Sequence, residues 1–344
     1  MTLDTQRLQK IIHTLLASGK GILAADESSG TIKKRFTSIN LESTEESRRD
    51  YRDMLFTTPG YEHHISGVIL YDETVDQQSC SGPTFSQLIA ERGIIPGIKT
   101  DEGKEEHPFL DPQTVTRGLK GLGKRLQAYT ERSQGIIGFT KWRQVILVDP
   151  EPSDGFLDYT MHVMAEQAAW SLQAGLVPIC EPEILMDGSH SLEECAAATE
   201  RTLRILYKCI SEQHVDPALT ILKTNMVLSG KDAKKDSPEE VGSATLKIFQ
   251  ASVPSSMPGI VFLSGGQHSI QATENLNLCS LQAKKINAPW VLSFSYGRAL
   301  QDDALKIWGG KREHVPAAQA AFLKRARLNG LAQQGKYDPR MEKE

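Results

Sequence analysis

Lys223 lies within the apolar stretch LTILKTNMVLSG, which runs from residue 219 to residue 230. Burying an unpaired ammonium group costs free energy, so a lysine in such a place must find partners or give up its proton. A neutral amine is a nucleophile toward ketones and forms a Schiff base with them. Lys223 is therefore a candidate catalytic residue, provided that the rest of the chain brings charged groups to it.

Charged and hydroxyl side chains recur toward the ends of the other apolar runs. They are Asp26, Asp72, Glu73, Lys99, Glu181, Glu183, Ser264 and Ser295, with Lys141 and Arg143 in the middle of another run. Cations converging near Lys223, together with partial desolvation, would disfavour its protonated form. The carboxylates would supply the acid and base that imine formation requires. One buried charge of this kind is most often a structural ion pair, but a set at corresponding strand ends favours a lysine-imine enzyme.

Two glycine-containing loops indicate phosphate binding. LSGGQHS, at residues 263–269, precedes a helical pattern, so that Gly265 and Gly266 let the backbone approach an anion at a helix N-terminus. SFSYGRA, at residues 293–299, supplies Gly297 and Arg298 after the last apolar run. A pair of glycines is usually only a turn. Two such loops after the seventh and eighth strands are nevertheless typical of phosphate sites in barrel enzymes.

Eight short apolar runs must position these residues, and helical patterns separate them. The runs cover residues 21–26, 67–73, 94–101, 138–147, 176–185, 219–225, 259–266 and 290–297. Capping boxes at Ser191 and Ser237 are expected to begin two helices, and Gly175 to follow the end of another. The alternation predicts an α/β fold, a parallel (β/α)8 barrel, with an extra N-terminal helix and C-terminal helices near 300–308 and 316–334. A doubly wound sheet would require the same alternation.

The bulk composition narrows the class of protein. Among 344 residues, 39 lysines and arginines face 43 aspartates and glutamates, for a net charge of -4. This balance disfavours a nucleic-acid partner, and no apolar run approaches the ~20 residues that cross a membrane. The five cysteines include no CxxC pair, which predicts reduced thiols of a cytoplasmic protein rather than a disulfide framework or a zinc site. We expect one catalytic barrel domain over 1–344, with a short tail from about residue 335.

Several segments together resemble one family, the class I, Schiff-base-forming fructose-bisphosphate aldolases. They are GKGILAADESSGTIKKRF, GVILYDET, PGIKTDEG, KWRQV, VPICEPEILMDGSH, LKTNMVLSG, FLSGGQ and FSYGRALQ. These segments span nearly the whole chain in the order of the family. The resemblance implies reversible cleavage of fructose 1,6-bisphosphate to dihydroxyacetone phosphate and glyceraldehyde 3-phosphate, in glycolysis or gluconeogenesis. It also implies sugar-phosphate substrates, a homotetramer, and no metal or other cofactor beyond the imine on Lys223.

The same resemblance implies a role for each matching residue. Lys223 would be the Schiff-base lysine, Glu181 the proton-transfer residue and Glu183 its carboxylate partner. Asp26 would help to orient Lys223 and the reacting hydroxyl, while the cations of Lys141 and Arg143 would polarise the site. The cradle for the ketose 1-phosphate would comprise Ser264, Gly265, Gly266, Ser295, Gly297 and Arg298. The contacts around the other phosphate would comprise Ser28, Thr31, Arg35 and Lys99.

The sequence departs from the family pattern in three places. Asn225 stands close after Lys223 in KTN, where many relatives have a proline after the lysine, and Thr31 replaces a serine but keeps the hydroxyl. The chain also lacks the longer tail ending in tyrosine that animal relatives have. Tyr337 lies too early in the tail for us to assign it a role in enamine proton exchange.

Three alternatives remain open from the sequence. Another lysine-imine enzyme, transaldolase-like or pyridoxal-dependent, would share the barrel, although two phosphate loops around one lysine favour a bisphosphate. A metal-dependent aldolase would need ligands, and His63-His64 is the only adjacent histidine pair. A non-catalytic scaffold or binding protein could retain the barrel, but it would not need the lysine and the glutamates that are present here.

Overall fold

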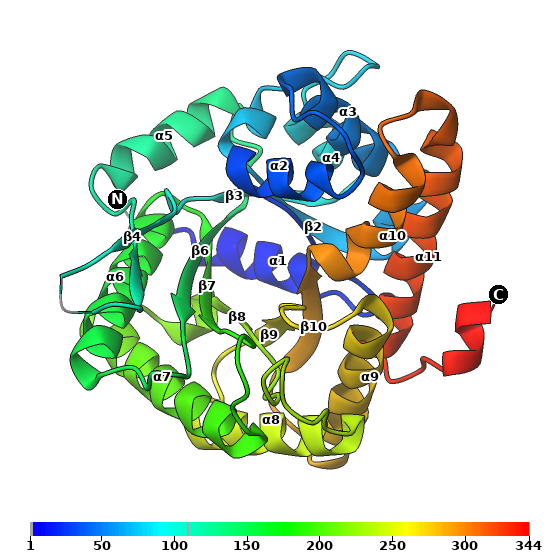
Figure 1. Ribbon diagram of the computed structural model, residues 1–344. Coiled ribbons are helices and arrows are strands. Elements are labelled where there is room, and N and C mark those ends of the chain that lie inside the picture. Colours follow the sequence, from blue (N-terminus) through cyan, green and yellow to red (C-terminus); the bar gives the residue numbers. More distant parts are fainter. Residues whose placement is uncertain (1–2, 109, 344) are drawn as a thin grey trace.

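Eight parallel strands close into a barrel in this computed structural model, which describes residues 3–108 and 110–343 (Figure 1). Around the barrel the order is β1-β10-β9-β8-β7-β6-β3-β2. The strands are β1 Gly21–Ala25, β2 Ile65–Leu70, β3 Ile95–Lys99, β6 Phe139–Ile146, β7 Val177–Ile184, β8 Ile221–Thr224, β9 Gly259–Phe262 and β10 Val291–Tyr296. Seven of the eight apolar runs contain one of them, and the run at 67–73 overlaps β2, which begins two residues earlier. The prediction of a (β/α)8 barrel is therefore confirmed, and the doubly wound alternative is wrong.

Helices surround the barrel, and their ends follow local sequence signals. They are α1 Thr5–Leu15, α2 Ser29–Thr37, α3 Glu45–Phe56, α4 Phe85–Glu91, α5 Leu122–Arg132, α6 Asp154–Gln173, α7 Leu192–Glu212, α8 Pro238–Ser252, α9 Ser269–Lys285, α10 Arg298–Trp308 and α11 Val315–Gln333. The expected capping boxes at Ser191 and Ser237 begin α7 and α8. Gly175 adopts a φ of +75° just after α6, the left-handed conformation expected of a helix stop. None of the helices in the described part of the chain is long and apolar enough to span a membrane.

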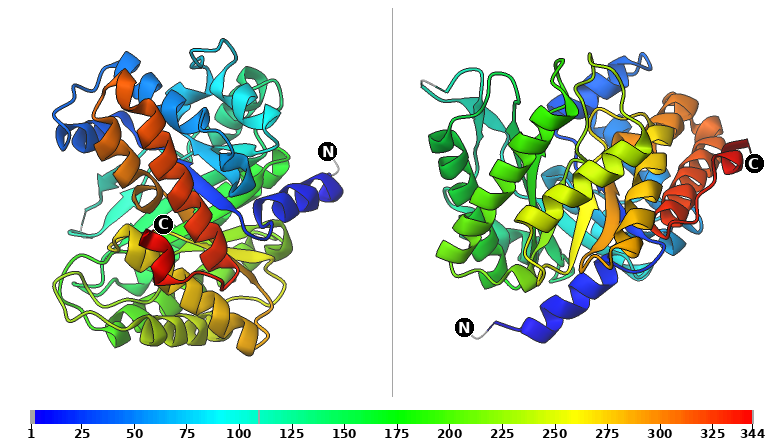
Figure 2. Two further views of the ribbon diagram at one scale, coloured as in Figure 1. Left: turned by 90° about the vertical axis from the view of Figure 1, so that its right-hand side faces the viewer. Right: turned by 90° about the horizontal axis from the view of Figure 1, so that it is seen from below.

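Helix α1 closes the end of the barrel at which the strands begin (Figure 2). Its leucines and isoleucines face inward, and Leu15 is fully buried. A Cβ at Gly67 would lie 2.5 Å from the Leu15 side chain, and one at Gly259 would lie 2.5 Å from Leu16. These two glycines therefore give the helix room to pack directly against the strands. Access to the barrel interior is left to the opposite end, where the strands finish.

A small hairpin that the sequence analysis did not predict lies at that open end. Strands β4 Lys104–Glu106 and β5 Thr114–Thr116 pair in an antiparallel arrangement. Thr116 fixes the hairpin to the barrel, since its hydroxyl donates to the carbonyl of Arg143 at 2.8 Å and its N–H donates to Gln144 at 3.0 Å. The hairpin thereby extends one side of the wall around the opening.

The last described residues fold back against α11. A 3-10 turn, η5 Pro339–Lys343, carries Glu342, which forms an ion pair with the buried Arg325 at 2.7 Å. The Tyr337 hydroxyl donates to the same carboxylate at 3.0 Å. Figure 1 shows this segment on the outer side of the barrel. The Tyr337 hydroxyl is therefore bound to Glu342 on the outer side of the barrel, and we assign it no role in the chemistry.

Candidate active site

A cavity of about 1070 Å³ lies where the barrel strands end. The residues lining it come from all eight strands or from the loops that follow them, and all but one of the sixteen candidate residues are among them. The cavity-lining candidates are Asp26, Ser28, Thr31, Arg35, Lys99, Lys141, Arg143, Glu181, Glu183, Lys223, Ser264, Gly265, Ser295, Gly297 and Arg298. The fold therefore brings together segments that are up to 272 positions apart in the chain, from Asp26 to Arg298.

Lys223 points into this cavity from β8 and is buried there, at 4% exposure. The register of β7 with β8 pairs Cys180 with Leu222, and the next step along both strands places Glu181 beside Lys223. The two side chains meet, with Lys223 Nζ 2.9 Å from Glu181 Oε1. The amine and a carboxylate are thus in direct contact at the base of the cavity, at a distance that allows proton transfer.

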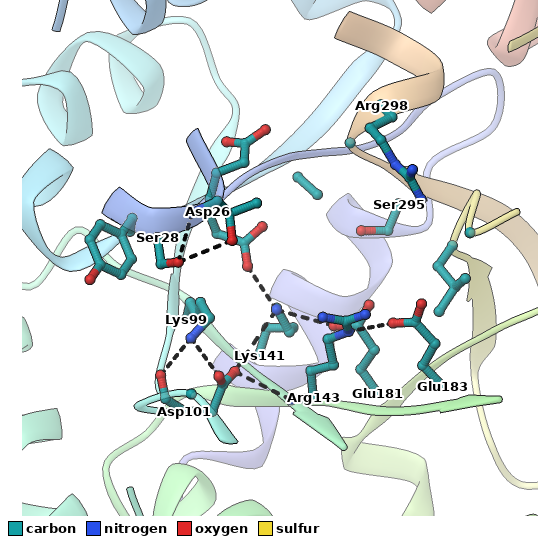
Figure 3. A pocket seen from close by; sticks show the side chains of 18 of the residues that line it. Asp26, Ser28, Lys99, Asp101, Lys141, Arg143, Glu181, Glu183, Ser295 and Arg298 are labelled. Atoms are coloured by element: carbon teal, nitrogen blue, oxygen red, sulfur yellow. Dashed lines mark hydrogen bonds and ion pairs between the residues drawn. The ribbon is translucent and has the colours of Figure 1, made fainter. Parts of the chain in front are cut away.

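Lys141 lies among three carboxylates (Figure 3). Its Nζ is 2.7 Å from Asp26 Oδ2, 3.1 Å from Glu181 Oε2 and 4.0 Å from Asp101 Oδ2. Burial alone would lower the pKa of Lys141, but these carboxylates outweigh it and raise the pKa above its ordinary value. Lys141 therefore stays charged and serves as a fixed cation.

This arrangement changes the electrostatic picture drawn from the sequence. Lys99, Lys141 and Arg143 do converge on the opening, but each is paired with a carboxylate. The charged group that touches Lys223 is Glu181, an anion. The sequence could place the cations at one end of the barrel, but it could not show that carboxylates from neighbouring strands neutralise them.

Asp26 and Glu181 both remain ionised in this setting. Burial would raise the pKa of Asp26, but Lys141 and then Lys223 overcome this and lower the pKa to about 2. Burial likewise opposes ionisation of Glu181, yet Lys141, Lys223 and Arg143 hold its pKa below the ordinary value. The ion pair of Asp26 is with Lys141, so Asp26 reaches Lys223 only as a nearby charge.

Glu183 turns toward Arg143 rather than toward Glu181 (Figure 3). Arg143 Nε donates to Glu183 Oε2, and this carboxylate raises the pKa of the guanidinium against the opposing effect of burial. The Arg143 side chain is 41% exposed, whereas that of Glu183 is 9% exposed. Arg143 therefore keeps part of its guanidinium open to the cavity, while Glu183 holds it in place.

The two glycine loops form one side of the cavity. Ser295 is buried at 1% exposure, and its Oγ has no hydrogen-bond partner among the described residues. Gly297 immediately precedes α10, and Arg298 is the first residue of that helix, so free N–H groups and a guanidinium lie together. Gly265 lines the cavity, where an added Cβ would lie 3.1 Å from Glu183 Oε1.

Gly266 is the one candidate that is not among the described residues lining the cavity. Its φ is +75°, and a Cβ there would lie 2.5 Å from Met186. Gly266 therefore forms the turn that allows its loop to pack against the chain after β7, and that turn is what presents Gly265.

The opposite side of the cavity is built on α2. Ser28 caps this helix, with its Oγ accepting from the N–H of Thr31 at 3.4 Å. Arg35 donates to Glu27 and, at 3.0 Å, to Gln301, and it forms an ion pair with Asp302 at 3.1 Å. Arg35 thus joins α2 to α10 as well as lining the cavity.

Asp101 is a site residue that the sequence analysis did not select. The Asp101 carboxylate accepts a hydrogen bond from Lys99 and lies 4.0 Å from Lys141. Its position in the sequence, two residues beyond Lys99, could have indicated that both side chains share one face.

Glu73, which the sequence analysis also placed at a strand end, forms ion pairs outside the cavity with Arg48 at 2.7 Å and with Arg52 at 2.6 Å. Glu73 therefore has a structural role.

The histidine pair considered as a metal site lies far from the cavity. His63 ends a 3-10 turn, η1 Tyr61–His63, and His64 directly precedes β2, at the end of the barrel where strands begin. All five cysteines are free. Neither feature contributes to the cavity.

Comparisons with known proteins agree with this geometry. The family model for fructose-bisphosphate aldolase class-I matches residues 7–344. The chain is 49% identical over 322 residues to the cytosolic fructose-bisphosphate aldolase 4 of Arabidopsis thaliana, covering 93% of this chain and 80% of the relative. It is 47% identical over 322 residues to a cytoplasmic isozyme of Pisum sativum, covering 93% and 88%. The solved aldolase of Plasmodium falciparum, crystallised with TRAP and a small-molecule inhibitor, superimposes with a TM-score of 0.94 at 42% identity, over 98% of each chain.

Proposed function

This chain belongs to the class-I fructose-bisphosphate aldolase family, and we propose that its cavity performs the reaction through a Schiff base on Lys223. The enzyme is a lyase that reversibly cleaves fructose 1,6-bisphosphate to dihydroxyacetone phosphate and glyceraldehyde 3-phosphate. The observation that carries our assignment is the buried amine of Lys223, 2.9 Å from Glu181 Oε1 and facing a cavity lined by cations. An amine placed in this way has a proton acceptor in contact and room for a sugar in front of it.

Imine formation begins with proton transfer between these two groups. Glu181 takes a proton from the Lys223 ammonium, which leaves a neutral amine and a neutral carboxylic acid. The amine attacks the C2 ketone, and the developing alkoxide is stabilised by the fixed cation of Lys141. Glu181 returns its proton to this oxygen, then accepts the second amine proton and passes it to the resulting hydroxyl, which leaves as water. The product is an iminium cation on Lys223 beside a regenerated carboxylate.

Carbon–carbon cleavage uses the iminium as an electron sink. As Glu181 removes the proton of the C4 hydroxyl, the C3–C4 electrons flow into the iminium, and the aldehyde departs from an enamine. Asp26, held ionised by Lys141, orients the hydroxyl for this step. Reprotonation of the enamine and hydrolysis of the imine then free the second product. The iminium supplies the polarisation for which other aldolases use a metal ion, so this chemistry needs no metal.

The two ends of the cavity suit the two phosphates. We assign the 1-phosphate to Ser264, Gly265, Ser295, Gly297 and Arg298, because a hydroxyl without a partner and a helix N-terminus meet there. Gly266 supports this cradle from outside the cavity.

The second phosphate is assigned to the side with Ser28, Thr31, Arg35 and Lys99. Arg35 and Lys99 already form ion pairs with carboxylates. We therefore expect them to attract the phosphate by their positive charge and to shape its binding site, without forming exclusive ion pairs with it. We also propose that the enzyme is a cytoplasmic homotetramer, in line with its family. The cytoplasmic part agrees with the names of the plant relatives.

Replacing Lys223 with methionine tests the assignment. Methionine keeps the length and packing of the side chain but has no nucleophile, so cleavage of fructose 1,6-bisphosphate should fall by roughly 10³-fold or more. The rate is measured by coupling triose phosphate formation to a dehydrogenase, and circular dichroism checks the fold.

Lys247→Met, an exposed position on α8, is the matched control and should cleave at the normal rate. Turnover retained by Lys223→Met would remove Lys223 from the reaction. A folded wild-type protein that cleaves no sugar phosphate would instead favour the scaffold alternative.

A further inference from the structure

A cluster of metal-ligating side chains lies on the outer wall of the barrel, where α6 and α7 run side by side (Figure 1). Asp158 and His162 are one turn apart on α6, and Cys209 and Glu212 are three positions apart on α7. The three ligand atoms of Asp158, His162 and Cys209 lie within 4.8 Å of one another. None of these residues belongs to the catalytic cavity.

The distances suit a tetrahedral ion. His162 Nδ1 lies 3.2 Å from Cys209 Sγ and 3.6 Å from Asp158 Oδ2. Zinc bonds of about 2.3 Å to sulfur and about 2.0–2.1 Å to nitrogen or oxygen place tetrahedral ligands roughly 3.4–3.6 Å apart. The distance between His162 and Cys209 must open slightly, and the His162 side chain, at 37% exposure, has room to adjust on its solvent side.

Glu212 supplies the outer contact that histidine ligands to metals commonly have. Its Oε2 lies 3.0 Å from His162 Nε2, and the other ring nitrogen, Nδ1, is the one beside Cys209 and Asp158. Nδ1 is also 2.8 Å from the carbonyl oxygen of Asp158, so the imidazole must turn away from that carbonyl before Nδ1 can bind a metal ion.

We propose that Asp158, His162 and Cys209 bind one divalent ion of the Zn²⁺ type through Oδ2, Nδ1 and Sγ, with a water molecule as fourth ligand and Glu212 orienting the imidazole. The ion takes its three protein ligands from two helices and therefore ties α6 to α7. Sequence spacing gave no sign of this site, because the absence of a CxxC pair excludes only motifs in which neighbouring cysteines supply the ligands.

The charges around the cluster balance with a divalent ion. Lys208 lies 3.0 Å from Asp158 Oδ1 and 3.7 Å from Glu212 Oε1. With the thiolate of Cys209, the two carboxylates and Lys208, the groups carry a net charge of −2, which a divalent cation neutralises. A cysteine binds a metal ion as the thiolate, so binding should strengthen as the pH rises.

Cobalt(II), used alone as the probe, gives the direct test. The full-length enzyme is stripped with EDTA, the EDTA is removed, and Co²⁺ is titrated while the near-ultraviolet absorption from thiolate-to-cobalt charge transfer is recorded. We expect one equivalent per chain, with the band lost in Cys209→Ala. In His162→Asn, whose half-exposed position tolerates the change, the affinity should fall roughly tenfold or more.

Cys80→Ser removes the exposed cysteine and is the matched control, so it should bind Co²⁺ as the wild type does. Zn²⁺ should raise the melting temperature of the wild type and of Cys80→Ser but not that of His162→Asn. Fructose bisphosphate cleavage should be unchanged in all of these variants. Absence of the charge-transfer band in the wild type, its persistence in Cys209→Ala, or full affinity in His162→Asn would each overturn the proposal. If Cys209→Ala fails to fold, His162→Asn decides alone.

Discussion

Lys223 and Lys141 are both buried lysines in the same cavity, yet their surroundings differ. Lys141 has three carboxylates within 4.0 Å, whereas Lys223 has an ion pair with Glu181. The better-compensated amine is held in its charged form and acts through its field. In the mechanism that we propose, the amine paired with Glu181 passes its proton to that carboxylate and becomes the nucleophile. Division of these two roles follows from the number of anions around each nitrogen.

The Asp26–Lys141 pair predicts a pH-dependent part of the stability. The pKa of Asp26 is about 2 in the folded protein, below its ordinary value of 3.8, so the unfolded chain binds more protons between these values. The pair therefore stabilises the fold fully above about pH 4, and this contribution, about 2 kcal/mol, is lost as the pH falls toward 2. In Asp26→Asn this part of the acid sensitivity should be missing.

Urea midpoints of the wild type and of Asp26→Asn, measured from about pH 6 down to about pH 3, check this expectation. The difference in stability between the two proteins should shrink as the pH falls. A constant difference over the whole range would show that the Asp26 carboxyl titrates as it does in the unfolded chain.

At the scale of elements, α2 and α10 both contribute residues to the opening of the cavity, and contacts of Arg35 join the two helices. Arg35 on α2 contacts Glu27 before that helix and Asp302 and Gln301 on α10. Gln301 in turn donates to the carbonyl of Ala24 in β1 at 2.7 Å. The two sides of the phosphate-binding region are thereby held to the same strand.

Arg35→Met should loosen this connection. The side chains of Arg35 and Glu27 are only 10% and 11% exposed, so the change leaves a buried carboxylate without its partner and should cost about 3 kcal/mol. The melting temperature should fall by several degrees, and KM should rise while Lys223 still forms its imine.

Arg204→Met is the matched control, because the Arg204 side chain is 58% exposed in its pair with Glu200. Removing that pair should change the stability by less than about 0.5 kcal/mol. Equal melting temperatures for the two variants would mean that Arg35 does not hold α2 and α10 together.

The sequence predicted the elements well where a physical signal was local. The buried parallel strands appear in the sequence as eight apolar runs, and the Ser-x-x-Glu motifs predicted where α7 and α8 begin. Both signals involve residues that are neighbours in the chain. The β4–β5 hairpin was missed because Lys104–Glu106 is a short, exposed and charged strand with no apolar pattern. Asp101 was missed as a partner of Lys141 because that contact depends on side-chain reach between strands.

At the scale of the whole molecule, the barrel separates stability from chemistry. Helix α1 closes one end, while charged residues from neighbouring strands gather at the other. The buried lysines and carboxylates of the cavity form ion pairs, so that the protein can bury them before any substrate arrives. The helices on the outer wall are free to carry other features, such as the cluster between α6 and α7.

EDTA should therefore leave the cleavage rate unchanged, because the iminium and Lys141 provide the polarisation. The rate is measured before and after chelation at a temperature well below melting. If the α6–α7 cluster holds a metal ion, chelation lowers the melting temperature without affecting turnover. A loss of activity that added metal restores would instead indicate metal-dependent aldol chemistry.

Trapping of the covalent intermediate tests the central claim most directly. The enzyme is incubated with dihydroxyacetone phosphate and borohydride, digested, and analysed by mass spectrometry. We predict irreversible inactivation, with the reduced triose phosphate attached to Lys223 and to no other lysine. Absence of a label, or a label on Lys141 or Lys99 in place of Lys223, would contradict the account.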